Sequence, residues 1–201
     1  ILLIAMEAQE QSGILNAVKD IVKSCTFDKF DMSKAPMFDV EYIFLNIRAK
    51  SVGEESSIKL KCPDDNETKV QHTVDLSKVE VEVEDGHTNK IALTDNVSIV
   101  MTYPTVKTFA GRNLKGLKAA DTIAMTGQCI HQIIDGIETY EANDLSEQEI
   151  SDFLENLTQA QFAKIQSFFA TMPRLKHVVS VTNPKTKKKG KVTLEGMQSF
   201  F

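Results

Sequence analysis

The 201 residues are 42% apolar and 25% charged, and their formal net charge at pH 7 is −5. This composition is that of a globular protein and excludes an intrinsically disordered chain. No window approaches the roughly 18 apolar residues of a membrane-spanning helix, so we expect a soluble protein with no membrane contact. The acidic balance argues against a general nucleic-acid-binding protein. Three cysteines (Cys25, Cys62 and Cys129) lie far apart, which favours reduced, buried thiols over a disulfide framework.

The first quarter of the chain is predicted to be helical. The apolar run Ile1–Met6 continues into acidic residues and has no basic flank, so it indicates part of a buried helix rather than a signal peptide. A second amphipathic helix is expected at 11–24. The third, Phe38–Glu54, carries apolar residues at helical spacing around more than one face, and Pro36 and Gly53 suit its entry and exit. We therefore expect this third helix at the centre of the core.

Beyond the third helix the apolar residues alternate at every second position, which is the period of strands. The turn sequence PDDN separates the first two such runs. The dipeptide Asp85-Gly86, which is typical of tight hairpins, follows the alternating run VEVEVE, and Asp95-Asn96 separates the last two runs. The expected strands are 58–62, 70–74, 79–84, 90–94 and 97–101.

These strands divide the predicted fold into two parts. Residues 56–103 are expected to form an antiparallel β lobe. This lobe is inserted into a helical domain of residues 1–55 and 104–201, which ends in a C-terminal β-hairpin. The predicted fold class is therefore α+β.

The helical period returns after the predicted lobe. One long helix is expected over residues 116–140, because isoleucines and other apolar residues recur there at helical spacing. Two capping boxes, Ser146 with Glu149 and Thr158 with Gln161, mark the starts of two more helices. The C-terminal hairpin pairs residues 177–181 with 191–194.

Three blocks of sequence occur in a characteristic order: LLIAME at 2–7, the helix end Ile21–Cys25, and Pro36–Glu54. In this order they resemble the baseplate hub proteins of T-even-type contractile-tailed phages. The resemblance returns at Asp95–Thr105 and in the C-terminal LEGMQSFF. These motifs are packing motifs, and no catalytic signature or cofactor accompanies them.

The resemblance implies a non-enzymatic protein that works through protein–protein contacts. It is expected to be a structural subunit of the tail baseplate hub, or a factor that promotes hub assembly without entering the final particle. Its implied partners are other hub and tail proteins. The implied location is the host cytoplasm during assembly and, for a subunit, the baseplate of the virion tail.

An alternative hypothesis is a metal-dependent factor or enzyme. Cys62 and His72 lie on neighbouring predicted strands and are candidate zinc ligands, with His87 as a further candidate. A structural zinc site needs four ligands, commonly in close pairs, and no second cysteine lies two to four residues from Cys62. A plain hairpin therefore stands beside the zinc site as an interpretation, and zinc analysis of the purified protein separates the two.

Two charged features are candidate partner-binding surfaces. One is a row of glutamates on the solvated face of a strand, and the other is a lysine tip in the loop NPKTKKKG. No aromatic residues are interleaved with the lysines, so base stacking and nucleic-acid binding are not expected. The opposite signs would serve two partners, or would meet in a head-to-tail homo-oligomer. The candidate residues are Glu80, Glu82 and Glu84 in the glutamate row, and Lys187, Lys188 and Lys189 in the lysine tip.

Overall fold

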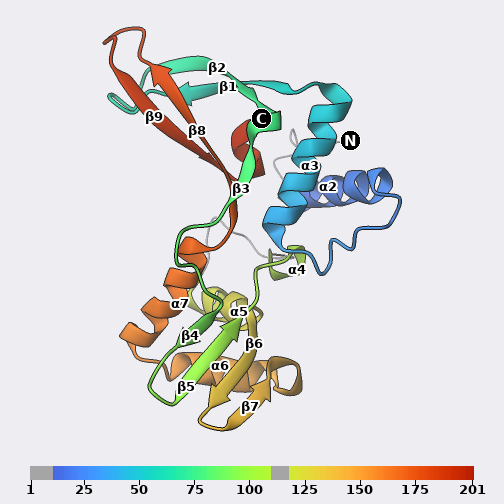
Figure 1. Ribbon diagram of the computed structural model, residues 1–201, viewed down its shortest axis with the longest axis vertical. Helices are drawn as coiled ribbons and strands as arrows, with labels where there is room; N and C mark the ends of the chain where they lie inside the picture. Colours follow the sequence, from blue (N-terminus) through green and yellow to red (C-terminus); the bar gives the residue numbers. More distant parts are fainter. Residues whose placement is uncertain (1–10, 110–117) are drawn as a thin grey trace. The chain divides into compact units, whose positions relative to one another are not determined.

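The computed structural model describes residues 11–109 and 118–201, which fold into two compact units (Figure 1). Each unit has its own hydrophobic core. None of the described helices is both long and apolar enough to cross a membrane. The first unit holds the described chain up to Asp31, Phe38–Glu82 and Pro173–Phe201, and the second holds Met32–Met37 and Val83–Met172.

The first unit combines two helices with two antiparallel sheets. Strand β1 pairs with β2, and the other sheet has the order β3-β8-β9. Its elements are α2 (Gln11–Cys25), α3 (Met37–Val52), β1 (Glu55–Lys61), β2 (Lys69–Asp75), the 3-10 helix η1 (Leu76–Lys78), β3 (Glu80–Glu82), β8 (Arg174–Thr182), β9 (Lys189–Glu195) and the 3-10 helix η4 (Met197–Phe200).

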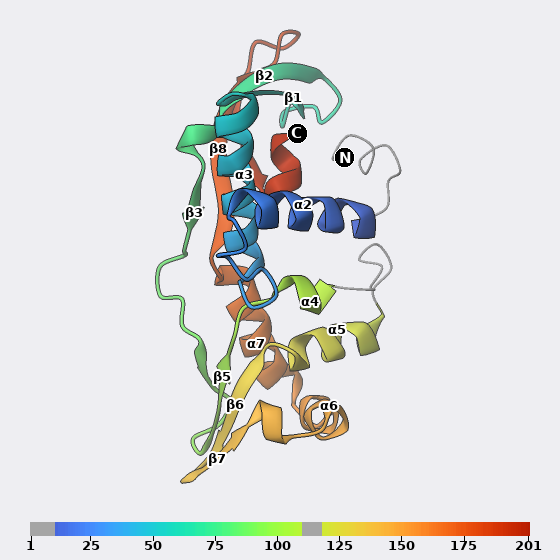
Figure 2. The ribbon, with the colours of Figure 1, turned by 90° about the vertical axis from the view of Figure 1, so that its right-hand side faces the viewer.

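Alternating side chains of both sheets form most of the first core. On β1, for example, every second residue from Ser56 to Leu60 is buried. Helix α3 forms where the sequence predicts it and contributes Leu45 and Ala49 to this core, whereas Tyr42 is 38% exposed. The C-terminal η4 lies beside α3 (Figures 1 and 2), and its fully buried Phe200 belongs to the same core. The strands, rather than α3 alone, therefore organise this core.

The second unit is one four-stranded antiparallel sheet, of order β4-β5-β6-β7, with α5, α6 and α7 on one of its faces (Figure 2). Buried side chains from the sheet and from α6 and α7, among them Ile99, Leu154 and Phe168, form its core. Its elements are β4 (Lys90–Ala92), β5 (Val97–Met101), α4 (Val106–Phe109), α5 (Ala119–Gly127), β6 (Ile130–Asp135), β7 (Glu138–Glu141), the 3-10 helix η3 (Ala142–Asp144), α6 (Glu147–Glu155) and α7 (Gln159–Thr171).

The capping boxes at the starts of α6 and α7 are confirmed. The backbone N–H of Ser146 donates to the Glu149 carboxylate at 2.8 Å, and the Glu149 N–H donates to the Ser146 hydroxyl at 3.2 Å. Thr158 and Gln161 repeat this reciprocal pair at 2.8 and 3.3 Å. Both helices therefore begin where their own side chains satisfy the first free backbone N–H groups.

The long helix predicted at 116–140 is wrong beyond Gly127, where α5 ends and β6 and β7 follow. The isoleucines after Gly127 fit helical spacing, but β-branched residues also favour strands. The turn between β6 and β7 contains Gly136, whose φ of +61° suits a residue without a Cβ, and the next residue, Ile137, is fully exposed. The residues Gly136-Ile137, between the paired Asp135 and Glu138, thus form a hairpin turn that the helical interpretation overlooked.

The α+β class and the C-terminal hairpin are confirmed. The strands within 56–103 are antiparallel as predicted, yet they do not pair only with one another. Strand β3 pairs with β8, so Asp85-Gly86 is not the turn of a hairpin, and β5 pairs with β6 as well as β4. The two compact units consequently have other boundaries than the predicted lobe and helical domain.

Candidate functional site

The turns of the β1–β2 and β8–β9 hairpins lie against each other in the first unit (Figure 1). Gly190, the second residue of β9, lies against Pro63 in the β1–β2 turn. A Cβ placed on Gly190 would lie 2.4 Å from Cγ of Pro63, which is too close for any side chain. Glycine at this position therefore permits the two turns to approach.

Asn183 joins the two turns through a side chain that is only 1% exposed. Its amide nitrogen donates to Asp64 Oδ1 at 3.0 Å and to Asp65 Oδ2 at 2.9 Å. Its amide oxygen accepts the backbone N–H groups of Lys185 at 2.8 Å and Thr186 at 3.4 Å. The Asn183 side chain thus uses both its donor and its acceptor functions, which fixes the orientation of the lysine-bearing turn.

The same hydrogen bonds favour the ionised form of both aspartates. The Thr186 hydroxyl, 2.5 Å from Asp64, and the Asn183 amide lower the pKa of the Asp64 carboxyl. The hydroxyl and backbone N–H of Thr68, with the backbone N–H of Glu67, lower the pKa of Asp65 well below its usual range. The two carboxylates therefore act as charged acceptors at the base of the lysine tip.

The side chains of the lysine tip are exposed, and hydrogen bonds to Asn183 hold its backbone. Lys185, Lys187, Lys188 and Lys189 are all exposed, and Lys187 has a φ of +61°. The Asn183 N–H donates to the Lys188 carbonyl, and the Lys187 N–H donates to the Asn183 carbonyl, each at 2.9 Å. The ammonium groups accordingly extend from a turn whose backbone is held in one conformation.

The predicted residues Lys187, Lys188 and Lys189 lie together, but sequence reasoning missed the residues that hold them. Each turn was recognised from its own chemistry, PDDN in one case and Asn183-Pro184 in the other. Nothing in a single sequence indicates that two turns about 120 residues apart in the chain meet, because that contact depends on how the two hairpins pack.

The predicted glutamate row does not form one continuous strand face. Glu80 and Glu82 are exposed on β3, an edge strand, whereas Glu84 lies beyond the end of β3. Glu80 lies opposite Lys176 and Glu82 opposite Arg174 in the register with β8, and the Glu82 carboxylate is 3.5 Å from the Lys176 ammonium. These carboxylates thus face cations of their own sheet, and their role in partner binding stays a prediction.

The candidate zinc ligands do not converge. His72 lies opposite Ile58 in the hairpin register, four residues from Cys62, which corresponds to about 13 Å along a strand. Cys62 is fully buried, and burial raises the pKa of its thiol. His87 belongs to the second unit, where its ring hydrogen-bonds Thr171 and Tyr103. In the part of the chain that the structure describes, no three His, Cys, Asp or Glu side chains gather as a metal site.

The three cysteines are free thiols, but they differ in exposure. Cys62 and Cys129 are buried as predicted, and burial raises the pKa of Cys129 to about 12. The prediction of a buried thiol is wrong for Cys25, which ends α2 and is exposed. Residues 2–7 of the resemblance lie outside the described residues, as do residues 116 and 117 of the helix predicted at 116–140.

A family model described as T4 bacteriophage base plate protein matches residues 1–201, the whole of the sequence. The chain belongs to this family. No curated protein and no solved structure matches it. The resemblance found from the blocks at 2–7, 21–25 and 36–54 is therefore confirmed at the level of a T4-type phage baseplate protein.

In this baseplate protein we expect the contact between the two hairpin turns to weaken at low pH, because it involves the carboxylates of Asp64 and Asp65. Because folding lowers the pKa of Asp64 and Asp65, their stabilising contribution is fully present above the ordinary pKa of 3.8 and is lost as pH falls toward the folded-state values. We expect the amides of Thr68 and Lys185 to lose hydrogen-exchange protection in acid before those of Leu175. Carboxyl resonances of both aspartates, followed by ¹³C NMR, should titrate below 3.8, and titration at or above that value would contradict this account.

Proposed function

We propose that this baseplate protein is a non-enzymatic structural subunit or assembly factor of the baseplate hub and acts through contacts with other hub and tail proteins. Family membership over the whole chain supports a baseplate role. The sequence blocks that resemble hub proteins, above all Pro36–Glu54, support the assignment to the hub. This proposal involves no cofactor, and it locates the protein in the host cytoplasm during assembly and in the virion tail if it is a subunit.

The observation that carries the proposal is the lysine tip on its fixed base. Charged groups at an interface steer the encounter of two proteins, and groups held in one conformation lose less entropy on binding than mobile ones. Asn183 and Gly190 provide that fixed base, and the lysines of the tip provide the charge. An acidic surface on a hub partner is the complement that this tip fits.

The first test is the rate of association with purified hub proteins. Replacing Lys187, Lys188 and Lys189 together with glutamate should slow association, and the difference from wild type should grow as the salt concentration falls. The stability of the folded monomer should change little, because exposed loop charges contribute little to folding. The measurement is the association rate constant against ionic strength.

A matched control variant distinguishes an effect of the lysine tip on the association rate from an effect of net charge. Lys19 on α2, Lys29 in the connection after α2, and Lys107 on α4 are exposed and lie away from the tip in the sequence, so reversing these three changes the net charge equally. The control should retain association rates close to those of wild type. If the two triple variants associate equally fast at low salt, the lysine tip is a solvated loop and the proposed contact is wrong.

A second experiment separates a hub subunit from an assembly factor. Mass spectrometry of purified virions and of baseplate assembly intermediates measures the amount of this chain in each. A subunit is found in both, and an assembly factor only in the intermediates. Its absence from every hub intermediate would contradict both forms of the proposal.

A further inference from the structure

The charges of this chain are separated along the sequence and in the fold. Residues 119–163 contain nine aspartates and glutamates and no lysine or arginine. They form α5, β6, β7, α6 and the start of α7, all in the second unit. The lysine tip and the neighbouring exposed Lys61 and Lys69, which flank the β1–β2 turn, lie in the first unit. One molecule thus offers a cationic surface and an anionic one.

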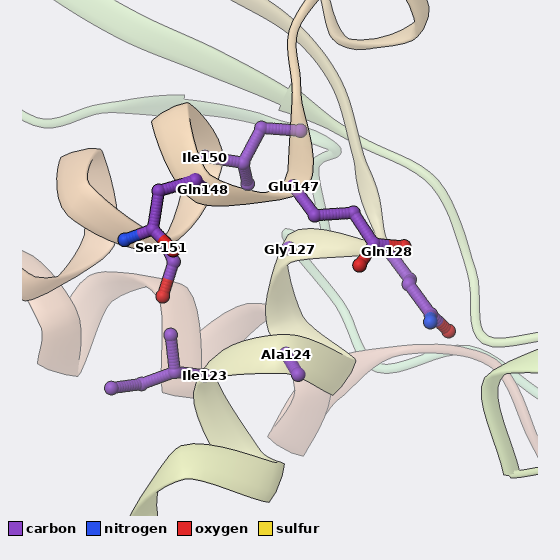
Figure 3. A pocket seen from close by; sticks show the side chains of 8 residues that line it. All are labelled: Ile123, Ala124, Gly127, Gln128, Glu147, Gln148, Ile150 and Ser151. Carbon is purple, nitrogen blue, oxygen red and sulfur yellow. The ribbon is translucent and has the colours of Figure 1, made fainter.

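A groove of about 310 Å³ lies between α5 and α6 within the acidic stretch (Figure 3). Gly127, at the end of α5, permits the close approach of the helices, because a Cβ there would lie 2.9 Å from Cγ2 of Ile150. Both apolar and polar side chains line the groove. Its lining residues are Ile123, Ala124, Gly127 and Gln128 from the α5 side, and Glu147, Gln148, Ile150 and Ser151 from α6.

Carboxylates border this groove on the α6 side. Glu147 lines it directly. The lining residue Gln148 donates to Asp152 at 2.7 Å, and the lining residue Ser151 donates to Glu155 at 3.3 Å. Glu147, Asp152 and Glu155 are all exposed, so the groove combines a partly apolar floor with an acidic rim.

We propose that the occupant of this groove is the lysine tip of a second copy of the chain. A lysine side chain suits such a groove, because its apolar stem packs on aliphatic surface while its ammonium group reaches charged acceptors. Here the stems of Lys187 and Lys188 would contact Ile123 and Ile150. Their ammonium groups would meet the carboxylates of the rim.

The tip is suited to this contact by its shape as well as its charge. It protrudes from a turn fixed by Asn183, so its backbone has little conformational freedom left to lose on docking. The glutamate row is a poorer partner for the tip, because Glu82 already pairs with Lys176 of its own sheet. The groove therefore replaces the glutamate row as the acidic partner in a head-to-tail assembly.

Such a contact joins two different surfaces of the chain. Each copy carries both a tip and a groove, so the contact either repeats from copy to copy, as a ring or an open chain, or is made twice in a reciprocal pair. This inference does not depend on the hub role, since it concerns only the affinity of the chain for itself.

The experiment is sedimentation equilibrium of the purified chain, whose monomer mass is 22.4 kDa. At about 0.1 M salt, where the Debye length is about 10 Å, the average mass should rise with concentration to at least about twice that of the monomer. At about 1 M salt, where the Debye length is about 3 Å, the association constant should fall by at least about tenfold.

Two complementary variants test the pairing of the two surfaces. The tip variant carries Lys187→Glu, Lys188→Glu and Lys189→Glu, and the groove variant carries Glu147→Lys, Asp152→Lys and Glu155→Lys. Each alone presents two surfaces of the same sign and should remain monomeric. Mixed together they again offer opposite signs, so the mixture should associate at low salt although neither component does.

The triple reversal of Lys19, Lys29 and Lys107 is the control for net charge and should associate like wild type. Circular dichroism of every variant establishes that it is folded. A wild-type chain that stays monomeric at all concentrations in 0.1 M salt would overturn the proposal. So would association of the tip variant alone, or a mixture that remains monomeric.

Discussion

Replacing Phe200 with alanine is expected to lower the free energy of unfolding by about 3–5 kcal/mol, the usual cost of emptying a buried phenylalanine site. Phe200 is fully buried among residues of α3, β1, β2, β8 and β9. Its backbone carbonyl also accepts the buried Ser56 hydroxyl at 2.6 Å, so a shift of η4 into the vacated space would weaken that bond. The measurement is urea unfolding followed by circular dichroism, because the chain has no tryptophan.

The neighbouring residue Phe201 provides the matched control. It is 36% exposed, and its ring makes an edge contact with Phe44 at 6.1 Å and lies 5.9 Å from the Arg48 guanidinium carbon. Phe201→Ala should therefore cost no more than about 1.5 kcal/mol, from the loss of these two ring contacts. Equal losses for the two variants would show that η4 is not anchored in the first core.

The elements that the sequence predicted correctly are those whose determinants are local. The capping boxes of α6 and α7 lie within four residues of each helix start, and each forms as expected. The β1–β2 hairpin follows from alternation around PDDN, and Asn66 in that turn adopts a φ of +55°. Short-range periodicity and turn chemistry are sufficient for such elements.

The incorrect predictions concern segments whose secondary structure or strand partner is determined by tertiary packing. Residues 130–135 carry isoleucines that fit either a helix or a strand, and pairing with β5 and β7 selects the strand. Likewise Val81 alternates with glutamates in a way that predicts a hairpin, but its partner is Leu175 on β8, more than 90 residues away in the chain. Pairing between residues this far apart in the chain cannot be predicted from the local sequence pattern of one strand.

The candidate site shows the same division between local and distant determinants. The lysine tip could be recognised as a charged loop, since its residues are consecutive. Its rigid base could not, because Asp64 and Asn183 come from different hairpins and meet only after the two hairpins pack. The groove between α5 and α6 was hidden for a further reason: the sequence predicted one continuous helix in place of α5 and the hairpin that follows it.

Replacing Asn183 with aspartate is expected to lower the free energy of unfolding strongly, although the two side chains have nearly the same size. In Asn183→Asp a carboxylate oxygen replaces the NH₂ group that donates to Asp64 and Asp65, so three carboxylates face one another around a buried position. Leaving a buried charge without a partner costs about 3–5 kcal/mol, and we expect a loss of stability of that size at neutral pH. The measurement is the free energy of unfolding of wild type and variant between about pH 7 and about pH 4.

The pH dependence of the stability loss shows whether the loss in Asn183→Asp comes from charge repulsion or from altered packing. Repulsion among the three groups raises the pKa of the new carboxyl in the folded state above its unfolded value, so the folded variant takes up a proton as the pH falls. A proton on any of the three carboxyls restores a donor, and the difference from wild type should therefore shrink toward pH 4. Asn183→Ala removes the same donors without adding a charge, and its loss should stay constant over this range. If both variants lose the same stability at every pH, the new carboxylate is not repelled by Asp64 and Asp65, and the expected charge effect at position 183 is wrong.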